Sequence, residues 1–253
     1  MYLKKKVIML LSATLAFSAV IPMTANAQNA AGAYQGDYKD GVPHGQGSYT
    51  FASGNKYVGE FRKGKLDGFG SYIWVNGDRY EGEFDDGQRT GNGVYIRADG
   101  SRYEGEFKNG MFHGDGKYVY ASGNTYVGEY ENDQPNGDGE FIWKSGTRYK
   151  GDYVNGKFHG KGKLFAADGS VYDGNFLAGQ RTGKGKFEWP NGDKYEGEFL
   201  NGKPHGQGKF TWADGARYQG QMVNGVMNGQ GKLKDERGKT IYEGQFVNGT
   251  PAG

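Results

Sequence analysis

The 253-residue chain contains no cysteine, and it has only six prolines and four histidines. Without cysteine the chain forms no disulfide and offers no thiolate for a metal site or a nucleophile. Long apolar runs are also missing. The longest, residues 7–21, is interrupted by polar residues and is shorter than the about 20 residues that a membrane-spanning helix needs.

That apolar run is flanked as in an export signal. Three lysines precede it, and Ala25-Asn26-Ala27 supplies the small residues that a signal peptidase reads. We therefore predict a secretory signal peptide at residues 1–27, cleavage after Ala27, and a short linker at 28–33. The mature protein is expected in the periplasm, in the cell envelope or secreted.

A strong charge of one sign is missing as well. The whole chain has a formal net charge of +2, and loss of the signal, with three lysines and no acids, leaves −1. Binding to nucleic acid requires a basic face. The near-neutral mature chain therefore predicts no nucleic-acid partner.

What the chain does have is a repeat. Starting at Tyr34 a tyrosine returns every 23 residues as far as Tyr218, and Tyr242 follows after one extra residue. Counting this tyrosine as position 1, all of the 48 glycines except Gly32 fall at positions 3, 8, 12, 14 and 21. A fixed period of this length is typical of repeat arrays, in which each unit must stack on its neighbours. Residues 34–253 are thus predicted to be a single array.

Each repeat alternates apolar and polar residues with period 2, which indicates two short strands. In the repeat that starts at Tyr195, the strands are expected to flank a loop at residues 201–205, which is rich in turn-forming residues. The prediction is about nine hairpins and a terminal strand, nineteen strands in all. These form an all-β, elongated, twisted antiparallel sheet of stacked hairpins.

The glycines and rings also predict a register. Within a hairpin Tyr195 should face Phe210, Gly197 should face Gly208, and Phe199 should face Gly206, while each position-18 tryptophan should pair with the following tyrosine. Rings laid across glycines and cross-strand aromatic pairs stabilise sheets. One face is then aromatic and the other charged, with acids at position 4 near lysines at positions 13 and 15.

The motif Y-x-G-x-F-x-N-G-x-x-x-G-x-G, repeated about nine and a half times, resembles the MORN repeat. The resemblance covers residues 34–253 and implies an elongated sheet of stacked hairpins that serves protein binding, self-association or phospholipid binding. The ninth repeat departs from it at residues 234–237, which favours a terminal cap in place of a regular hairpin.

Catalytic and metal-binding patterns are missing. All four histidines (His44, His113, His159 and His205) fall at position 11, so neighbouring ones lie at least four strands, or about 19 Å, apart and cannot share an ion. Stacked copies of one environment do not separate the pKa values of two carboxyl groups, as acid–base catalysis requires. The sequence predicts no enzyme, no catalytic residue, no metal and no cofactor.

The aromatic face is the remaining candidate for function. Its expected residues are Trp74, Trp143, Trp189, Trp212, Tyr103, Tyr126, Tyr149, Tyr172 and Tyr195. Large exposed apolar patches usually mark interaction sites, although the rings could instead only shield one face of the sheet. We expect a non-enzymatic exported binding or scaffold protein that uses this face for a protein partner or self-association. The alternatives are binding of membrane phospholipid or of envelope glycan.

Overall fold

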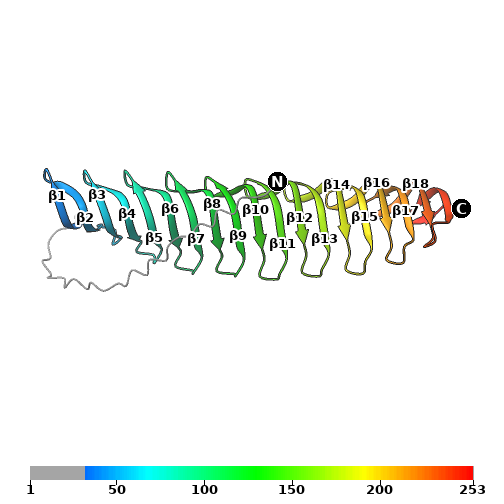
Figure 1. The fold of residues 1–253 in the computed structure, drawn as a ribbon, viewed down its shortest axis with the longest axis horizontal. Helices are drawn as coiled ribbons and strands as arrows, with labels where there is room; N and C mark the ends of the chain where they lie inside the picture. The colour runs from blue at the N-terminus through cyan, green and yellow to red at the C-terminus, as the bar shows by residue number, and fades with distance from the viewer. Residues whose placement is uncertain (1–31, 253) are drawn as a thin grey trace. The chain divides into compact units, whose positions relative to one another are not determined.

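The computed structural model describes residues 32–252, which form one antiparallel sheet of twenty strands and no helix (Figure 1). The predicted signal peptide at 1–27 and most of the linker at 28–33 lie outside the described residues. The strands are β1 Ala33–Lys39, β2 Val42–Thr50, β3 Lys56–Arg62, β4 Lys65–Ile73, β5 Arg79–Asp85, β6 Gln88–Ile96, β7 Arg102–Lys108, β8 Met111–Val119, β9 Thr125–Glu131, β10 Gln134–Ile142, β11 Arg148–Val154, β12 Lys157–Phe165, β13 Val171–Leu177, β14 Gln180–Glu188, β15 Lys194–Leu200, β16 Lys203–Thr211, β17 Arg217–Val223, β18 Val226–Lys234, β19 Thr240–Val247 and β20 Thr250–Pro251.

Every strand pairs with the next one along the chain, from β1–β2 to β19–β20, so the hairpins stand side by side in sequence order (Figure 1). The predicted sheet of stacked hairpins is confirmed. Residues 32–252 hold no helix that is long and apolar enough to cross a membrane.

The turn within each hairpin is tighter than predicted. Between β15 and β16 only Asn201 and Gly202 form the loop, with φ angles of 49° and 81°, and Lys203 already begins the next strand. Positive φ at both residues is what a two-residue type I′ turn requires, and Asn-Gly is its preferred pair. The expected loop at 201–205 is therefore wrong, and the position-11 histidines lie on strands.

The predicted register holds near the tyrosine and fails near the turn. Tyr195 faces Phe210 and Gly197 faces Gly208, as predicted. Phe199, however, faces Pro204, and Gly206 faces Met222 of the next repeat. The cause is a bulge in which residues 205–207 lie opposite Glu198 alone, and Gly206 takes a φ of +69° there.

The core is a row of position-1 tyrosines, eight of which are at most 1% exposed. Tyr103 shows the pattern. Its ring meets Phe107 and Tyr130 edge-on at 5.2 Å each, and it stacks on Phe112 at 3.8 Å. Its hydroxyl donates a hydrogen bond of 2.8 Å to the Glu106 carbonyl oxygen. Rings of neighbouring repeats thus bury each other, so that a single-layer sheet acquires a core.

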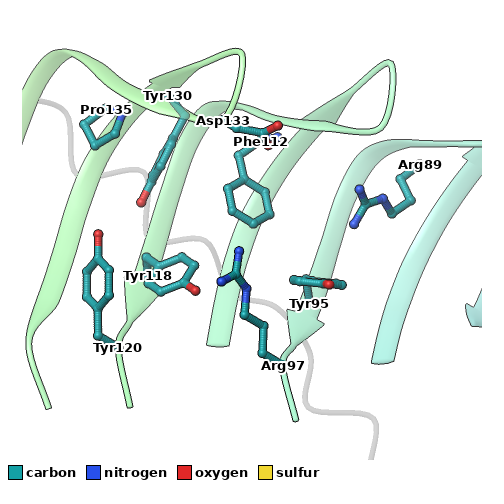
Figure 2. Close-up of a pocket in the computed structure, with 9 residues that line it drawn as sticks. All are labelled: Arg89, Tyr95, Arg97, Phe112, Tyr118, Tyr120, Tyr130, Asp133 and Pro135. Carbon is teal, nitrogen blue, oxygen red and sulfur yellow. Dashed lines mark hydrogen bonds between the residues drawn. The ribbon is translucent and has the colours of Figure 1, made fainter. Parts of the chain in front are cut away.

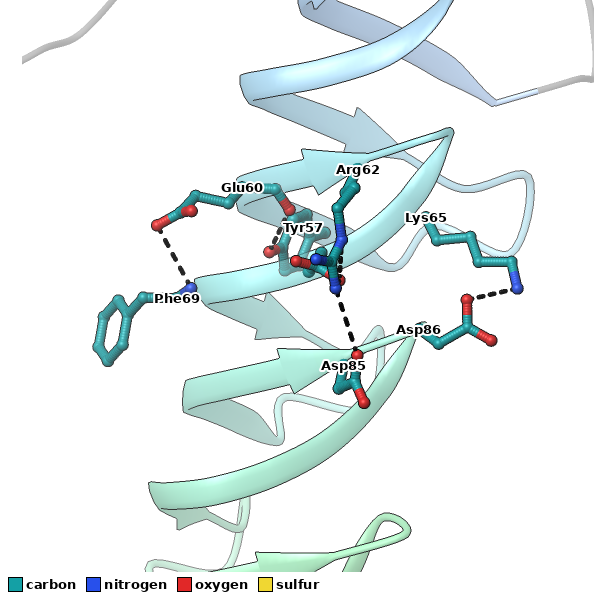
Figure 3. A network of polar contacts seen from close by, with 8 residues as sticks. Tyr57, Glu60, Arg62, Lys65, Phe69, Asp85 and Asp86 are labelled. Carbon is teal, nitrogen blue, oxygen red and sulfur yellow. Dashed lines mark hydrogen bonds and ion pairs between the residues drawn. The ribbon is translucent and has the colours of Figure 1, made fainter.

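The other face of the sheet is mainly polar and carries surface ion pairs such as Lys65 with Asp86 (Figure 3). Position-4 acids do not pair with lysines as predicted. They accept hydrogen bonds from backbone N–H groups of the bulge, as when Glu83 Oε1 accepts one from Asn92 at 2.9 Å. Lysines at position 15 pair instead with position-2 acids of the next repeat, such as Lys163 with Asp173 at 3.5 Å. These pairs link adjacent hairpins at the surface.

The C-terminal end also differs from the prediction. In the ninth repeat β18 pairs with β17 from Val226 to Lys234 and with β19 from Gly229 to Lys234. A register shift between Leu233 and Lys234, opposite Ile241, absorbs the extra residue. The ninth repeat is therefore a complete hairpin and not a cap. The short β20 then pairs with β19, which gives twenty strands in place of the nineteen expected.

Candidate binding face

We use the term aromatic face for the residues at positions 16 and 18, which lie on the same side of the sheet as the buried tyrosines. Position 16 holds Tyr49, Tyr72, Tyr95, Tyr118, Phe141, Leu164, Phe187, Phe210 and Leu233. Position 18 holds Phe51, Trp74, Arg97, Tyr120, Trp143, Ala166, Trp189, Trp212 and Asp235. Nearly all of the apolar members are partly buried and pack against the tyrosine core. Together they form two parallel rows along the sheet.

The tryptophans come from the turns that join one hairpin to the next. Trp189 donates its backbone N–H to the Asp193 carbonyl and accepts from Gly192, both at 2.9 Å. This closes a tight turn and places the indole over the neighbouring repeat. The predicted pairing of each tryptophan with the following tyrosine is wrong, because Tyr195 pairs with Phe187, a position-16 residue.

Trp74, Trp143 and Trp189 each contact rings of two repeats, whereas the ring contact of Trp212 is to Phe210 of its own repeat. Trp74 lies 4.5 Å from Tyr72 of its own repeat and 5.5 Å from Tyr95 of the next one, measured between ring centroids. Trp143 bridges Phe141 and Phe158 in the same way, at 4.6 and 5.9 Å. Trp74, Trp143, Trp189 and Trp212 all stay partly exposed. The first three therefore hold neighbouring hairpins together, and all four still offer an edge to a partner.

The predicted tyrosines behave differently. Tyr103, Tyr126, Tyr149, Tyr172 and Tyr195 are between 0 and 1% exposed, so no partner can contact them. The prediction that these five tyrosines belong to a contact surface is therefore wrong. Period-2 alternation identified the correct face, but rings of the adjacent repeats cover it at position 1. The four tryptophans remain a predicted contact surface.

A cavity of about 400 Å³ opens on the aromatic face between the third and fifth repeats (Figure 2). The residues that line it are Arg89, Tyr95, Arg97, Phe112, Tyr118, Tyr120, Tyr130, Asp133 and Pro135. Two of them, Arg89 and Arg97, are cations within an otherwise aromatic row. The sequence alone did not single out this site, although the replacement of an aromatic residue by Arg97 at position 18 was a visible signal.

Arg89 is enclosed by rings. Its guanidinium lies 5.2 Å from the Tyr95 centroid and 5.3 Å from that of Phe107, and it donates a hydrogen bond to the Gly110 carbonyl. Burial lowers the pKa of this guanidinium, and the surrounding π faces offset part of the cost of desolvation. Arg89 therefore serves mainly to join the third and fourth repeats.

A second cavity, of about 210 Å³, lies on the same face near the C-terminal end. Its lining includes Phe210, Trp212, Met222 and Met227 and contains no charged side chain. Methionine side chains adapt to many shapes. The aromatic face therefore has one charged and one wholly apolar hollow.

The position-11 histidines are distributed one to a hairpin, on β2, β8, β12 and β16. Among residues 32–252 no three His, Asp or Glu side chains lie close enough together to hold a metal ion.

Tandem hairpins that bury one shared row of rings define the chain as an open β-repeat protein. The MORN repeat model matches ten consecutive segments, from residues 34–56 through 218–240 to 242–253. The chain belongs to the MORN repeat family. Such repeats are non-enzymatic modules that bind proteins or membranes.

The similarity of this chain to solved structures is weaker than its match to the family. The SAS-4 TCP domain of Drosophila melanogaster, in complex with a proline-rich motif of Ana2, shares 13% identity with this chain. The match covers 62% of this chain and 86% of that one, with a TM-score of 0.39. The TCP10 domain of Danio rerio CPAP also shares 13% identity, covering 82% and 91%, with a TM-score of 0.37. A comparison with curated protein sequences found no match.

Proposed function

We propose that this chain is an exported, non-enzymatic binding or scaffold protein whose aromatic face takes a protein segment or a second copy of the chain. The observation that carries the proposal is the row of partly exposed rings from Tyr49 to Trp212, over which no other element of residues 32–252 lies. Apolar patches of this extent usually mark interaction sites. Aromatic anchors in such patches supply most of the energy of an interface.

The proposal is tested by two matched double variants. Trp143→Ser with Trp189→Ser removes apolar anchors, whereas Lys209→Gln with Lys234→Gln removes two charges from the opposite face. We expect the tryptophan variant to weaken association with envelope proteins, or self-association, about tenfold or more, and the lysine variant to change it little. Circular dichroism first confirms that both variants are folded, because the indoles also join repeats.

Phospholipid binding is the second candidate, because Lys209, Arg217, Lys232 and Lys234 line a cavity of about 250 Å³ on the polar face. Four basic side chains reach the lower end of the about four to eight that anionic lipid recognition uses. Lys232, however, is already paired with Glu243 at 2.7 Å. Flotation with phosphatidylglycerol vesicles that is lost in the lysine variant and kept in the tryptophan variant would overturn the first proposal.

Envelope glycan is the third candidate. Sugars also stack on the exposed faces of indole rings, so glycan binding would be lost with the tryptophans as well. Sedimentation with purified, protein-free cell-wall polysaccharide distinguishes glycan binding from protein binding. A chain that binds glycan sediments with the polysaccharide, whereas a chain that binds only protein stays in the supernatant.

Export rests on the lysines and the Ala25-Asn26-Ala27 site near the N-terminus. Mass spectrometry of the native protein is expected to find Gln28 as the first residue. An intact Met1 chain recovered from the cytoplasm would contradict export and leave the binding face unaffected.

A further inference from the structure

Three residues that line the cavity between the third and fifth repeats differ from the residues at the same positions of most other repeats. Arg97 stands at position 18, where Trp74 and Trp143 stand in other repeats. Tyr130 adds a hydroxyl to a ring that is phenylalanine in the three preceding repeats, and Asp133 replaces the turn glycine at a φ of 65°. A non-glycine residue in this region strains the backbone. All three side chains line one cavity, although they come from different repeats.

Some polar groups of this cavity already have partners. The Tyr95 hydroxyl donates a hydrogen bond of 2.6 Å to Asp78, and Asp133 accepts one of 2.7 Å from the Phe112 backbone N–H. Among residues 32–252 the exposed Arg97 guanidinium forms no ion pair, although the Asp78 and Asp99 carboxylates lie near enough to interact with its charge. Within the same residues the hydroxyls of Tyr118, Tyr120 and Tyr130 make no hydrogen bond to protein atoms. Figure 2 shows the Arg97 guanidinium between the rings of Tyr95 and Tyr118 and pointing toward Phe112. The Tyr120 hydroxyl is a donor at neutral pH, as phenols are, and burial raises its pKa further. A guanidinium and three phenol hydroxyls supply donors that bind an anionic acceptor more strongly than a neutral one.

The charge and the volume of the cavity restrict the class of ligand that it can bind. Arg89 is enclosed by rings, so Arg97 is the accessible cation, while Asp133 carries a negative charge at the cavity edge. One available cation beside an acid suits a carboxylate of single charge better than a phosphate with up to two. A volume of about 400 Å³ is near the small end of ligand pockets and accommodates one side chain with its flanking groups.

We propose that this cavity binds a glutamate or aspartate side chain of a partner protein segment, with apolar neighbours of that residue lying on the adjacent rings. This inference rests on the proposed function and names the chemistry of the partner. Arg97 pairs with the carboxylate, and the tyrosine hydroxyls donate to its remaining lone pairs. The aromatic walls exclude water and strengthen the pair.

A peptide-display selection on the mature protein tests the proposal. We expect enriched peptides to carry an acidic residue flanked by aromatic residues, leucine or proline. Arg97→Trp restores the residue of Trp74 and so keeps the repeat intact. It should weaken a selected peptide about tenfold or more, as loss of a charge-assisted hydrogen bond predicts. The matched control Arg79→Gln removes the same charge from the opposite face and should change affinity less than about twofold.

A double-mutant cycle between the protein and the peptide tests whether Arg97 contacts the acidic residue of the peptide. Replacing the peptide's acidic residue by its amide should cost as much as Arg97→Trp, and the two changes together should cost little more than either alone. The proposal is overturned if no peptide is enriched, if the enriched peptides lack acids, or if Arg97→Trp leaves their affinity unchanged. Arg97-dependent binding of phosphatidylglycerol vesicles would also overturn it, in favour of a lipid. If the selected peptides contain no acidic residue and their binding still depends on Trp143 and Trp189, this inference is overturned and the proposed function stands.

Discussion

The ring of Tyr103 lies flat against Gly116 on the neighbouring strand, so closely that a Cβ atom on Gly116 would come within 2.5 Å of both the Tyr103 hydroxyl oxygen and a ring carbon. The same relationship recurs between the position-1 tyrosine and the position-14 glycine along the array. The glycine is therefore required by the space that the ring occupies.

Gly116→Ala is expected to lower the free energy of unfolding by about 1–3 kcal/mol, because the tyrosine ring must leave its place. Gly110→Ala in the turn of the same hairpin is the matched control. It meets no atom within 4 Å but takes a φ of +78°, so its cost is one of backbone conformation only. Denaturant unfolding in a double-mutant cycle with Tyr103→Leu should show coupling for Gly116→Ala and none for Gly110→Ala.

Tyr126→Phe should destabilise the chain by about 1 kcal/mol, since the Tyr126 hydroxyl donates a hydrogen bond of 3.0 Å to the Glu129 carbonyl, which loses its partner in the variant. Tyr38→Phe, at a ring that is 61% exposed, is the control, with an expected change below about 0.5 kcal/mol. Equal midpoints of thermal unfolding for the two variants would contradict the role of this hydroxyl.

Alkaline pH should weaken the fold. Burial raises the pKa of Tyr172 and that of Tyr195 from 10.0 to about 12. Above pH 10 the unfolded chain loses these protons while the folded chain keeps them. The contribution of the two tyrosines to stability is therefore constant below about pH 10 and is lost between about pH 10 and about 12. Denaturant midpoints measured across this range, together with tyrosinate absorbance, check the prediction. Ionisation that precedes unfolding would contradict it.

The surface ion pairs between hairpins should matter little. Lys186 and Glu196 lie 3.2 Å apart with 63% and 65% of their side chains exposed. Lys186→Gln is expected to change the free energy of unfolding by less than about 0.5 kcal/mol, since exposed pairs gain little over hydration and are screened by salt. Thermal unfolding at low and high salt measures the difference. A loss above about 1 kcal/mol would show that the pair contributes more than surface charge usually does.

Much of the fold could be predicted because glycine and tyrosine recur in strict register. The pairs Tyr195–Phe210 and Gly197–Gly208 follow from placing rings across glycines. The two-residue turn was missed, although Asn201-Gly202 carried its signal. The bulge opposite Glu198 was missed as well, because regular alternation assumes that strands of a hairpin advance together.

The candidate site was less accessible to prediction. Alternation assigned Tyr103 to the correct face, but its burial depends on Phe107 and Tyr130, and Tyr130 belongs to another repeat. The charged cavity likewise combines Arg97 and Asp133 from different repeats. Residues 23 positions apart become neighbours only when hairpins stack, so these contacts required the structure.

The turn that carries each position-18 side chain also sets a unit of length. Position 18 returns once per hairpin, or every about 9.6 Å along the sheet by the usual strand spacing. A partner that extends along the face therefore meets one position-18 side chain at each regular step, and each further contact is an intramolecular event at high effective concentration. The avidity of such a partner should therefore depend on how many hairpins it spans. The minimum length of a partner segment that stays bound should depend on the same number.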